Sequence, residues 1–383
     1  MKKLNILVIP SWYPNEKDPL WGNYFIKQSD ALNEYANVSM LHIDRVGLKE
    51  IKKLLKEKMS DGFDNSKYSF KFYKKTILNL KSLSLDLSYK KYVSAGYRAY
   101  KEMKKELGNF DIVLVESILP AGLIAREIFK KDNVPYIVHA HSEMIMTNEI
   151  YKKYVDLVMK DAKSYMGVNK RIVDIVKERR KDCYLVPNFI DCSKFDIPRK
   201  TSKDKFILTS ISNFYKVKKV DVLLKALDKV IKQGYKNIHL NIIGTGEYKY
   251  YYESICKSLN LTDYVSFIGY VDNKDIPMYL SKTNALCVSS SFETFCIPII
   301  EAFSAGVPVI TTDCEGPSHL VDKTRGVIVP IDDTNKYADG IIKMINNYDK
   351  YNSDKIKKYA FSNYDKSVIC KKIIDICNET IEK

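Results

Sequence analysis

The sequence lacks the patterns of several common classes of protein. None of its apolar runs approaches the ~20 residues that a membrane-spanning helix needs. No GxGxxG turn follows the first predicted strand, residues 4–9, which argues against a dinucleotide-binding first domain. No acidic cluster such as Asp-x-Asp follows a predicted strand, and the adjacent Asp332 and Asp333 fall in a late loop. We therefore expect no bound metal.

Cysteine is present, but not in the spacing of a zinc site or a redox pair. The eight cysteines include no CxxC pair and no Cys/His cluster with zinc-ligand spacing. Several lie within apolar runs, such as Cys287 in NALCVSS. This pattern is typical of reduced, buried thiols in a cytosolic protein.

The N-terminus, MKKLNILVIPSWYP, shares only its first residues with the pattern of a signal peptide. Its apolar run is interrupted by Pro10 and Pro14, and no small-residue cleavage site follows. We therefore predict a buried first strand, and a protein that is cytoplasmic or peripheral on the inner face of the cell membrane.

The charge balance is strongly basic, with 62 Lys and Arg against 47 Asp and Glu and a net charge of +15. This balance favours an acidic partner: phosphates, nucleic acid or an anionic membrane surface. Lysines spread over the whole surface for solubility explain it equally well. No aromatic-basic RNA module or base-reading helix is present, so we expect no nucleic-acid partner.

Short apolar segments alternate with amphipathic segments of helix length along the chain. The apolar segments are continuous, as strands of a sheet covered on both faces require. This alternation predicts βαβ units and an α/β fold with doubly wound parallel sheets. The predicted strands are residues 4–9, 38–43, 111–117, 136–141, 165–168, 183–187, 206–212, 239–244, 265–270, 285–290, 308–313 and 326–330.

The alternation stops between residues 188 and 205, a polar stretch that contains Pro198 and ends in a run of charge. We predict an interdomain linker there. Two Rossmann-like domains, residues 1–188 and 189–363, would then face a cleft, and a helix over residues 364–383 would return to the N-terminal domain. Ligands of such sheets bind beyond the carboxyl ends of the strands, so the informative residues should follow strands.

The stretch SSSFETFCIPIIEAFSAGVPVI, residues 289–310, places two carboxylates after a predicted strand. Pro298 suits the first turn of a helix, so Glu301 lies early in that helix and Glu293 in the loop before it. A helix N-terminus offers unpaired N–H groups to phosphates and hydroxyls, and a carboxylate suits the paired hydroxyls of a sugar or ribose. The N–H groups in question are those of Phe295, Cys296 and Ile297.

The segment ETFCIPIIEAFSAGVPVITTD resembles the Glu-x7-Glu signature of retaining glycosyltransferases of family GT4, which have the two-domain GT-B fold. The usual form is E-x-F-G-x-x-x-x-E-A-x-x-x-G-x-P-V, and Cys296 stands here at the glycine position. CEGPSHLV is similar to the family's Gly-Gly-Pro-x-Glu run, with His319 in place of the acid. The region from about residue 45 to residue 105 has no match.

Three further segments extend the resemblance toward the N-terminus. KDNVPYIVHAHSE is similar to the family's Pro-x5-His segment, which places its histidine at His141. YLVPNFID is similar to the Pro-Asn-Gly-x-Asp segment, with Phe189 in place of glycine. ISNFYKVKKVDVLLKAL is similar to the Gly-Arg-x-x-x-x-Lys-Gly segment, with Asn213 at the arginine position and Lys218 at the lysine position.

The resemblance implies a role for each matched residue. Glu301 would hold the ribose hydroxyls of a nucleotide sugar, Glu293 would contact the donor sugar, and Lys218 would offset the charge on the leaving diphosphate. The catalytic residues implied are His141, Glu293 and Lys218. The residues expected at the donor are Gly22, Asn213, Lys218, Phe295, Cys296, Ile297 and Glu301. Gly22 is included because Trp21-Gly22-Asn23 follows the first strand and would bring backbone close to the donor phosphates or the acceptor.

The function implied is that of a retaining glycosyltransferase. It would move a sugar from a UDP- or GDP-sugar to a hydroxyl of a glycan or lipid-linked acceptor in cell-surface polysaccharide synthesis. The family uses a same-face substitution, so neither a metal nor another cofactor is expected. Two alternatives stay open: a GT-B sugar-nucleotide epimerase or phosphorylase, and a non-catalytic protein that binds anions or an anionic membrane surface.

Two features of the first half allow more than one interpretation. His139 lies on the same strand face as His141, and either ring suits a buried core position. Residues 45–59 carry an apolar stripe among lysines, which fits an interfacial amphipathic helix or a helix packed on a sheet. The stripe consists of Leu48, Ile51, Leu55 and Met59.

Overall fold

A computed structural model of the chain describes residues 3–15, 18, 21–47, 50–64, 66–82, 84–202 and 204–383. The chain forms two compact units, which are described one at a time. The first comprises Met1–Val186 and Cys370–Lys383, and the second comprises Pro187–Ile369. The boundaries predicted from the sequence are residue 188 for the first and residue 363 for the second.

The first unit contains, within the described residues, an eight-stranded sheet in the order β3-β4-β2-β1-β5-β6-β7-β8. Every pairing is parallel except that of β3 with β4. The strands are β1 (Asn5–Pro10), β2 (Asn37–Gly47), β3 (Gly62–Asp64), β4 (Lys71–Asn79), β5 (Ile112–Glu116), β6 (Tyr136–Ala140), β7 (Ser164–Gly167) and β8 (Cys183–Leu185). The helices are α1 (Asn23–Asn33), α2 (Ile51–Lys58), α3 (Leu85–Leu107), α4 (Ala121–Asp132), α5 (Lys152–Asp161) and α6 (Lys170–Lys177).

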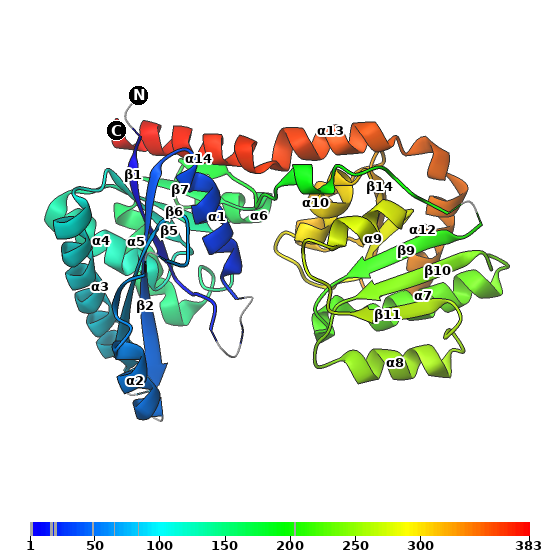
Figure 1. The fold of residues 1–383 in the computed structure, drawn as a ribbon, viewed down its shortest axis with the longest axis horizontal. Helices are drawn as coiled ribbons and strands as arrows, with labels where there is room; N and C mark the ends of the chain where they lie inside the picture. The colour runs from blue at the N-terminus through cyan, green and yellow to red at the C-terminus, as the bar shows by residue number, and fades with distance from the viewer. Residues whose placement is uncertain are drawn as a thin grey trace. The chain divides into compact units, whose positions relative to one another are not determined.

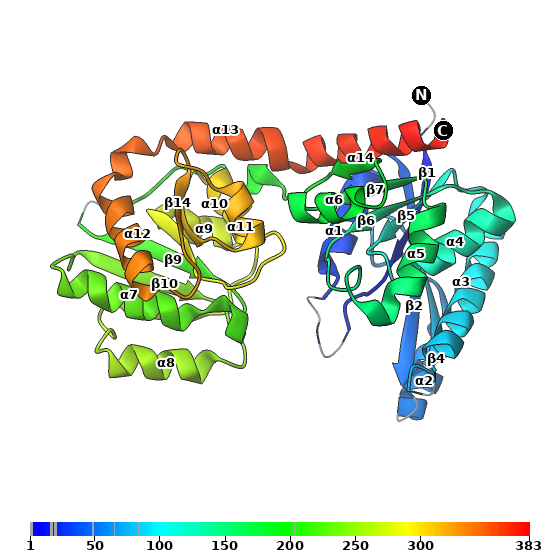
Figure 2. The same ribbon diagram turned by 180° about the vertical axis from the view of Figure 1, so that it is seen from behind.

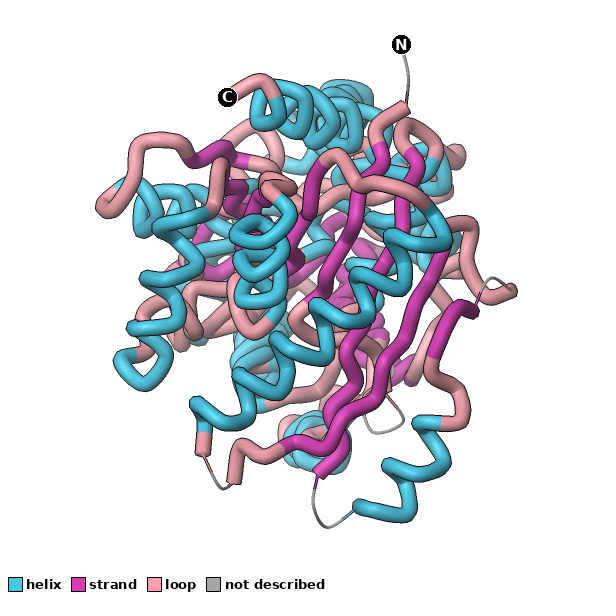
Figure 3. The backbone as a smooth tube through the Cα atoms, turned by 90° about the vertical axis from the view of Figure 1, so that its left-hand side faces the viewer, coloured by secondary structure: helices cyan, strands magenta, loops and turns pink. Residues whose placement is uncertain are grey.

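Helices cover both faces of this sheet. On one face α3, α4 and α5 form a layer, and on the other lies α1 (Figures 1 and 2). Figure 3 shows the strands of this sheet side by side beneath their helices. The central strand β5 is buried along its whole length, which is why its sequence is continuously apolar up to Glu116. The long helix α3 begins after Ser84, whose hydroxyl accepts a hydrogen bond from the N–H of Leu87.

The prediction for residues 45–59 is wrong in its first part. Residues 45–47 continue β2, because β4 pairs with β2 residue by residue as far as Gly47 and Asn79. The helix α2 follows only at Ile51. Of the predicted apolar stripe, Leu48 and the side chain of Ile51 lie outside the described residues. Leu55 and Met59 do not pack on the sheet, since they are 65% and 89% exposed.

The second unit contains, within the described residues, a six-stranded parallel sheet in the order β11-β10-β9-β12-β13-β14. Numbered within this unit the order is 3-2-1-4-5-6, which is that of a Rossmann fold. The strands are β9 (Phe206–Ile211), β10 (Ile238–Ile243), β11 (Val265–Gly269), β12 (Ala285–Val288), β13 (Val309–Thr312) and β14 (Gly326–Val329). The helices are α7 (Val220–Lys232), α8 (Lys249–Ser258), α9 (Ile276–Lys282), α10 (Ile297–Ser304), α11 (Glu315–Leu320), α12 (Thr334–Asn346) and α13 (Ser353–Tyr364).

Alternate residues of the second sheet enter two separate hydrophobic layers. Leu240 and Cys287 pack with α7, α8 and α12, whereas Leu286 and Val309 pack with α9, α10 and α13. Figure 2 shows α7 and α12 together on the first of these faces. All twelve predicted strands overlap observed ones, so the predicted fold class, two doubly wound α/β domains, is confirmed. All eight cysteines are among the described residues; they are buried, and none is in a disulfide.

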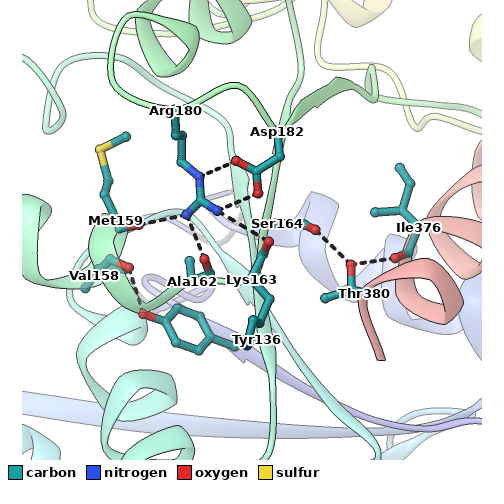
Figure 4. A network of polar contacts seen from close by, with 10 residues as sticks. All are labelled: Tyr136, Val158, Met159, Ala162, Lys163, Ser164, Arg180, Asp182, Ile376 and Thr380. Carbon is teal, nitrogen blue, oxygen red and sulfur yellow. Dashed lines mark hydrogen bonds and ion pairs between the residues drawn. The ribbon is translucent and has the colours of Figure 1, made fainter. Parts of the chain in front are cut away.

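The last helix, α14 (Lys366–Ile381), is shared by the two units. At its start the N–H of Lys366 donates to the carbonyl of Ile190 in the second unit, at 2.8 Å. Near its end Thr380 Oγ1 lies 2.9 Å from Ser164 Oγ in the first unit (Figure 4). Cys377 between them is completely buried. No helix in the described part of the chain has the length and apolar character needed to cross a bilayer.

Arg180, between α6 and β8, fixes the end of α5 in the first unit (Figure 4). Its Nη1 donates to the carbonyl oxygens of Met159 and Ala162, both at 2.7 Å, and its Nη2 donates to that of Lys163 at 3.3 Å. Its Nε donates to Asp182 Oδ1 at 2.7 Å. One planar guanidinium thus satisfies carbonyl groups that the end of a helix leaves without intrahelical partners.

Candidate functional site

The order of the second sheet places its topological switch point at the carboxyl ends of β9 and β12. The connections from these neighbouring strands run in opposite directions along the sheet, which is where open α/β sheets bind ligands. Lys218 lies on the loop after β9 and Glu293 on the loop after β12. Lys218 Nζ is 2.6 Å from Glu293 Oε1, and the two side chains are only 18% and 16% exposed.

Backbone contacts hold these two loops together. Ser289 Oγ donates to the carbonyl of Lys218 at 2.8 Å, and the N–H of Ser291 donates to the carbonyl of Val217 at the same distance. Ser290 Oγ also donates to Glu293 Oε1, at 2.9 Å. The serine run SSS that precedes Glu293 therefore positions both members of the ion pair.

Lys218 is protonated in this contact. Burial works against the charge on Lys218, but the Glu293 carboxylate beside it more than offsets burial and raises the pKa of Lys218. A protonated lysine at the carboxyl edge of a parallel sheet is suited to the negative charge of a phosphate.

The start of α10 explains the glycine of the resembled signature. Cys296 caps the helix with a φ of +74°, in the left-handed region that glycine adopts without strain. Pro298 lies in the first turn, as predicted, and Glu301 lies half-buried within the helix. Burial raises the pKa of Cys296 well above its ordinary value, so its thiol stays protonated. A Cβ on Gly316 would lie 2.7 Å from the backbone nitrogen of Phe295, so Gly316 allows close packing behind this turn.

We expect the Cys296→Gly variant to be more stable than the Cys296→Ala variant, by about 1 kcal/mol. Alanine keeps the steric strain of a left-handed backbone conformation, whereas glycine adopts the same conformation without strain. Cys287, in the regular strand β12, is the control position, because glycine there should be less stable than alanine. Urea denaturation of the four variants measures both differences in stability. If alanine were more stable than glycine at both positions, the backbone at Cys296 would not be strained.

The other predicted donor residues of the second unit lie on the segments that follow β9 and β12 and at the start of α10. Asn213 follows β9 and is exposed, and its carbonyl accepts from the N–H of Tyr215 at 2.9 Å. Phe295 is buried against the ring of Tyr364, and Ile297 is half-buried at the first position of α10. His319 is exposed on α11.

The two remaining predicted residues, Gly22 and His141, lie in the first unit. Gly22 precedes α1 with a φ of +82°, and a Cβ there would lie 3.0 Å from the carbonyl oxygen of Trp12, so the turn requires glycine. His141 follows β6, and its Nε2 lies 2.6 Å from Glu116 Oε2. Its ring packs edge-on against Phe25.

Glu116 was not predicted from the sequence. It is the last residue of β5 and is completely buried, and its Oε1 accepts a hydrogen bond from Gln28. Burial alone would raise the pKa of Glu116, but His139 and His141 outweigh burial and lower the pKa to about 2. The resulting stabilisation is present above the ordinary pKa of 4.5 and is lost as the pH falls toward 2. The sequence feature that could have identified Glu116 is a charged residue within the apolar run IVLVES.

A pocket of about 640 Å³ opens in the first unit, between the segment after β1 and strands β2 and β4. One wall is the stacked pair Trp12 and Trp21, whose rings are 5.9 Å apart and inclined by 8°; Trp21 is 52% exposed. Tyr13 stacks on His42 at 4.6 Å. Burial, Lys74 and Arg45 lower the pKa of His42 to about 3, so its ring is neutral. Charged side chains complete the lining: Asp44, Arg45, Glu50, Glu57, Asp64, Lys67 and Lys74.

Two parallel-sheet α/β units of this kind define the GT-B fold of glycosyltransferases. The structure of Anabaena HepE in complex with UDP has a TM-score of 0.73 to this chain, at 16% identity, over 99% of this chain and 100% of that one. Residues 193–362, most of the second unit, match the family model for glycosyl transferases group 1.

Curated relatives are similar over part of their length. An uncharacterized glycosyltransferase of Methanocaldococcus jannaschii is 28% identical over 226 residues, which are 54% of this chain and 55% of the relative. The UDP-Gal:alpha-D-GlcNAc-diphosphoundecaprenol alpha-1,3-galactosyltransferase of Escherichia coli is 23% identical over 64% of this chain and 68% of its own. The matched segments thus span 55% and 68% of the length of these two relatives.

Proposed function

We propose that the chain is a retaining glycosyltransferase of the GT4 type that uses a UDP- or GDP-sugar. The observation that carries this proposal is the Lys218–Glu293 ion pair at the switch point of the second sheet, directly before the N-terminus of α10. The match of residues 193–362 to glycosyl transferases group 1 supports it. So does the Escherichia coli relative, whose name gives UDP-Gal as donor.

In the proposed reaction the acceptor oxygen bonds to the anomeric carbon on the face from which the diphosphate leaves. The bond from that carbon to the phosphate oxygen breaks, and the acceptor proton passes to the leaving phosphate. The products are a glycoside with retained configuration and a nucleoside diphosphate. Lys218 and the N–H groups at the start of α10 stabilise the departing charge, and Glu293 and His141 contact the donor sugar.

This charge stabilisation comes from the protein, so we propose that transfer needs no metal. Release of nucleoside diphosphate should therefore be unchanged in the presence of EDTA. A loss of turnover that Mg²⁺ or Mn²⁺ restores would contradict this part of the proposal.

Glu301 is proposed to accept hydrogen bonds from the two ribose hydroxyls. A thermal-shift screen with UDP, GDP, ADP and CMP tests it: a nucleotide at 100 times its Kd should stabilise the protein by about 2.7 kcal/mol. The Glu301→Ala variant should lose this shift. The control is Asp339→Ala on the exposed face of α12, which should keep it. A wild-type protein that no nucleotide stabilises would overturn the proposed function.

The alternatives predict different products. A GT-B epimerase converts the nucleotide sugar without an acceptor, and a phosphorylase requires inorganic phosphate. A protein that only binds anions would respond alike to the three diphosphates UDP, GDP and ADP, and would lose them steeply with salt. Product analysis with and without acceptor, at two salt concentrations, separates these outcomes.

The acceptor is proposed to be a sugar of a glycan or lipid-linked precursor, bound in the pocket of the first unit. Exposed tryptophan faces and carboxylates are the groups that pack against and hydrogen-bond pyranose rings. Trp21→Ala should raise the KM for the acceptor about tenfold, equivalent to about 1.4 kcal/mol, and leave the UDP-induced thermal shift unchanged. Tyr250→Ala, exposed on α8, is the control. An unchanged acceptor KM in Trp21→Ala would show that the acceptor does not bind against Trp21 in this pocket.

We propose that this glycan belongs to cell-surface polysaccharide synthesis and that the protein binds the anionic inner membrane surface. The support is the net charge of +15 and the exposure of Leu55, on the lysine-rich helix α2, and of Met59, directly after it. Cosedimentation with vesicles tests this. Binding to anionic vesicles and not to zwitterionic ones is expected, and no binding to either would remove this proposal.

A further inference from the structure

A cluster of polar side chains that contact one another lies in the first unit, where β5 and β6 end. Glu116 is at its centre, with Gln28 on one oxygen and His141 on the other. His139 approaches the same oxygen as His141: its Nδ1 is 3.6 Å from Glu116 Oε2. Glu116 and His139 are completely buried, and the His141 side chain is 9% exposed. The resembled family signature contains no counterpart of this carboxylate.

The hydrogen bonds determine which ring nitrogens carry protons. Glu116 is ionised, so it can only accept, and His141 must donate to it from Nε2–H. His139 donates from its own Nε2–H to the carbonyl of Val186, at 3.0 Å. In its neutral form, His139 would therefore turn a bare Nδ1 lone pair toward the carboxylate, where it has no hydrogen-bond partner. A group of this composition can be held together by hydrogen-bond protons or by a metal ion.

The distances decide between a proton and a metal ion. One ligand atom from each of Glu116, His139 and His141 lies within 4.8 Å of the others, so the group has the composition of a metal site. Ligand atoms about 2.1 Å from a tetrahedral Zn²⁺ lie about 3.4 Å apart. His141 Nε2 and Glu116 Oε2 are only 2.6 Å apart, which is a hydrogen-bond length. The second oxygen of Glu116 is already occupied by Gln28.

We propose that Glu116 is a positioning residue for His141. It holds the imidazole ring with Nε2–H directed inward, so that Nδ1 is the nitrogen through which His141 meets a sugar hydroxyl. This proposal rests on the proposed function, in which His141 lies beside the transferred sugar. In a neutral ring Nδ1 accepts a hydrogen bond, so His141 would orient a hydroxyl rather than donate a proton to it.

The ring state can be measured without any substrate. The chain has only five histidines, so ¹⁵N-histidine labelling gives few signals in a long-range ¹H–¹⁵N spectrum. We expect the wild-type His141 to show Nε2 protonated. Glu116→Ala should give a mixture of tautomers, and Glu116→Gln should restore the single form, because the amide oxygen accepts the same hydrogen bond. A His141 signal that is the same in all three proteins would overturn the proposal, whatever the outcome for the function.

Kinetics test whether Glu116 acts through His141. The assay is release of nucleoside diphosphate from UDP-glucose, UDP-galactose and GDP-mannose. We expect Glu116→Ala to lower kcat about 10- to 100-fold, with little change in KM, and Glu116→Gln to recover most of it. In the His141→Ala background, Glu116→Ala should cost less than a further twofold, because the group it positions is absent. Equal losses in both backgrounds would show a structural role only.

Two controls keep the result interpretable if Glu116→Ala folds poorly. Glu116→Gln should move the acid limb of the kcat/KM profile to lower pH, because a protonated ring loses its neighbouring anion. An unmoved limb would contradict the proposal. Metal analysis of the purified wild-type protein completes the test. Stoichiometric zinc, with loss of the Nε2–H signal, would replace the positioning proposal with a metal site.

Discussion

Replacement of Lys218 by methionine should lower kcat about 100- to 1,000-fold. The ammonium group is the charged donor at the switch point, and loss of one such contact with developing charge typically costs about 2.7–4 kcal/mol of barrier. Methionine keeps most of the length of the side chain and removes its charge and its N–H donors, including the donor to Glu293. The effect should appear in kcat rather than in KM, because the diphosphate gains charge only as the sugar leaves.

The matched control for Lys218 is Lys216, two residues earlier on the same loop and exposed. Lys216→Met should change kcat less than twofold. Steady-state release of nucleoside diphosphate measures both variants, with the nucleotide-induced thermal shift as a check on donor binding. Equal losses of kcat in the two variants would show that the effect comes from the net charge of the protein. An unchanged kcat in Lys218→Met would show that Lys218 has no role in the mechanism.

Replacement of Arg180 by alanine should lower the free energy of unfolding by about 3 kcal/mol. The substitution leaves Asp182 without its cation and removes the donors from the carbonyl groups of Met159 and Ala162. Breaking a buried charged pair costs roughly 3–5 kcal/mol, and the 18% exposure of Arg180 places the expected loss at the lower end. Arg180→Lys should recover little, since an ammonium group cannot reproduce the planar fork.

Arg179 provides the control for Arg180. It is the preceding residue and has the same chemistry, but it is 39% exposed and pairs with Asp156 at the surface. Its removal should cost less than about 1 kcal/mol. Urea denaturation followed by circular dichroism separates the two variants, and a difference below 1 kcal/mol between them would show that the guanidinium does not hold the end of α5.

The strands were predictable because each lies in a sheet covered on both faces and therefore reads as a continuous apolar run. β4 was missed for the opposite reason. Its sequence, KFYKKTILN, mixes lysines with apolar residues, because β4 lies near the edge of the sheet with only β3 beyond it. The extension of β2 to Gly47 depends on pairing with β4, more than 30 residues later, and no local pattern contains that information.

For the candidate site, the sequence identified individual residues but did not show which residues they contact. The motif placed Lys218 and Glu293 after strands, and their 2.6 Å contact follows from the adjacency of β9 and β12, which the sheet order alone determines. Glu116 was missed because its partners, Gln28 and His141, come from other elements. The left-handed backbone at Cys296 was hidden because the residue there is not glycine.

The course of α14 has a consequence for how the protein is made. Residues 370–383 belong to the unit that begins at the N-terminus, and they supply the buried Ile373 and Cys377 and the contact of Thr380 with Ser164. During synthesis residues 187–369 leave the ribosome before residues 370–383, so the second unit can be complete before the first unit acquires its last helix. A nascent chain halted after residue 369 would therefore carry a finished second half and an open first half. Deletion of residues 370–383 should accordingly damage the first unit and leave the second intact.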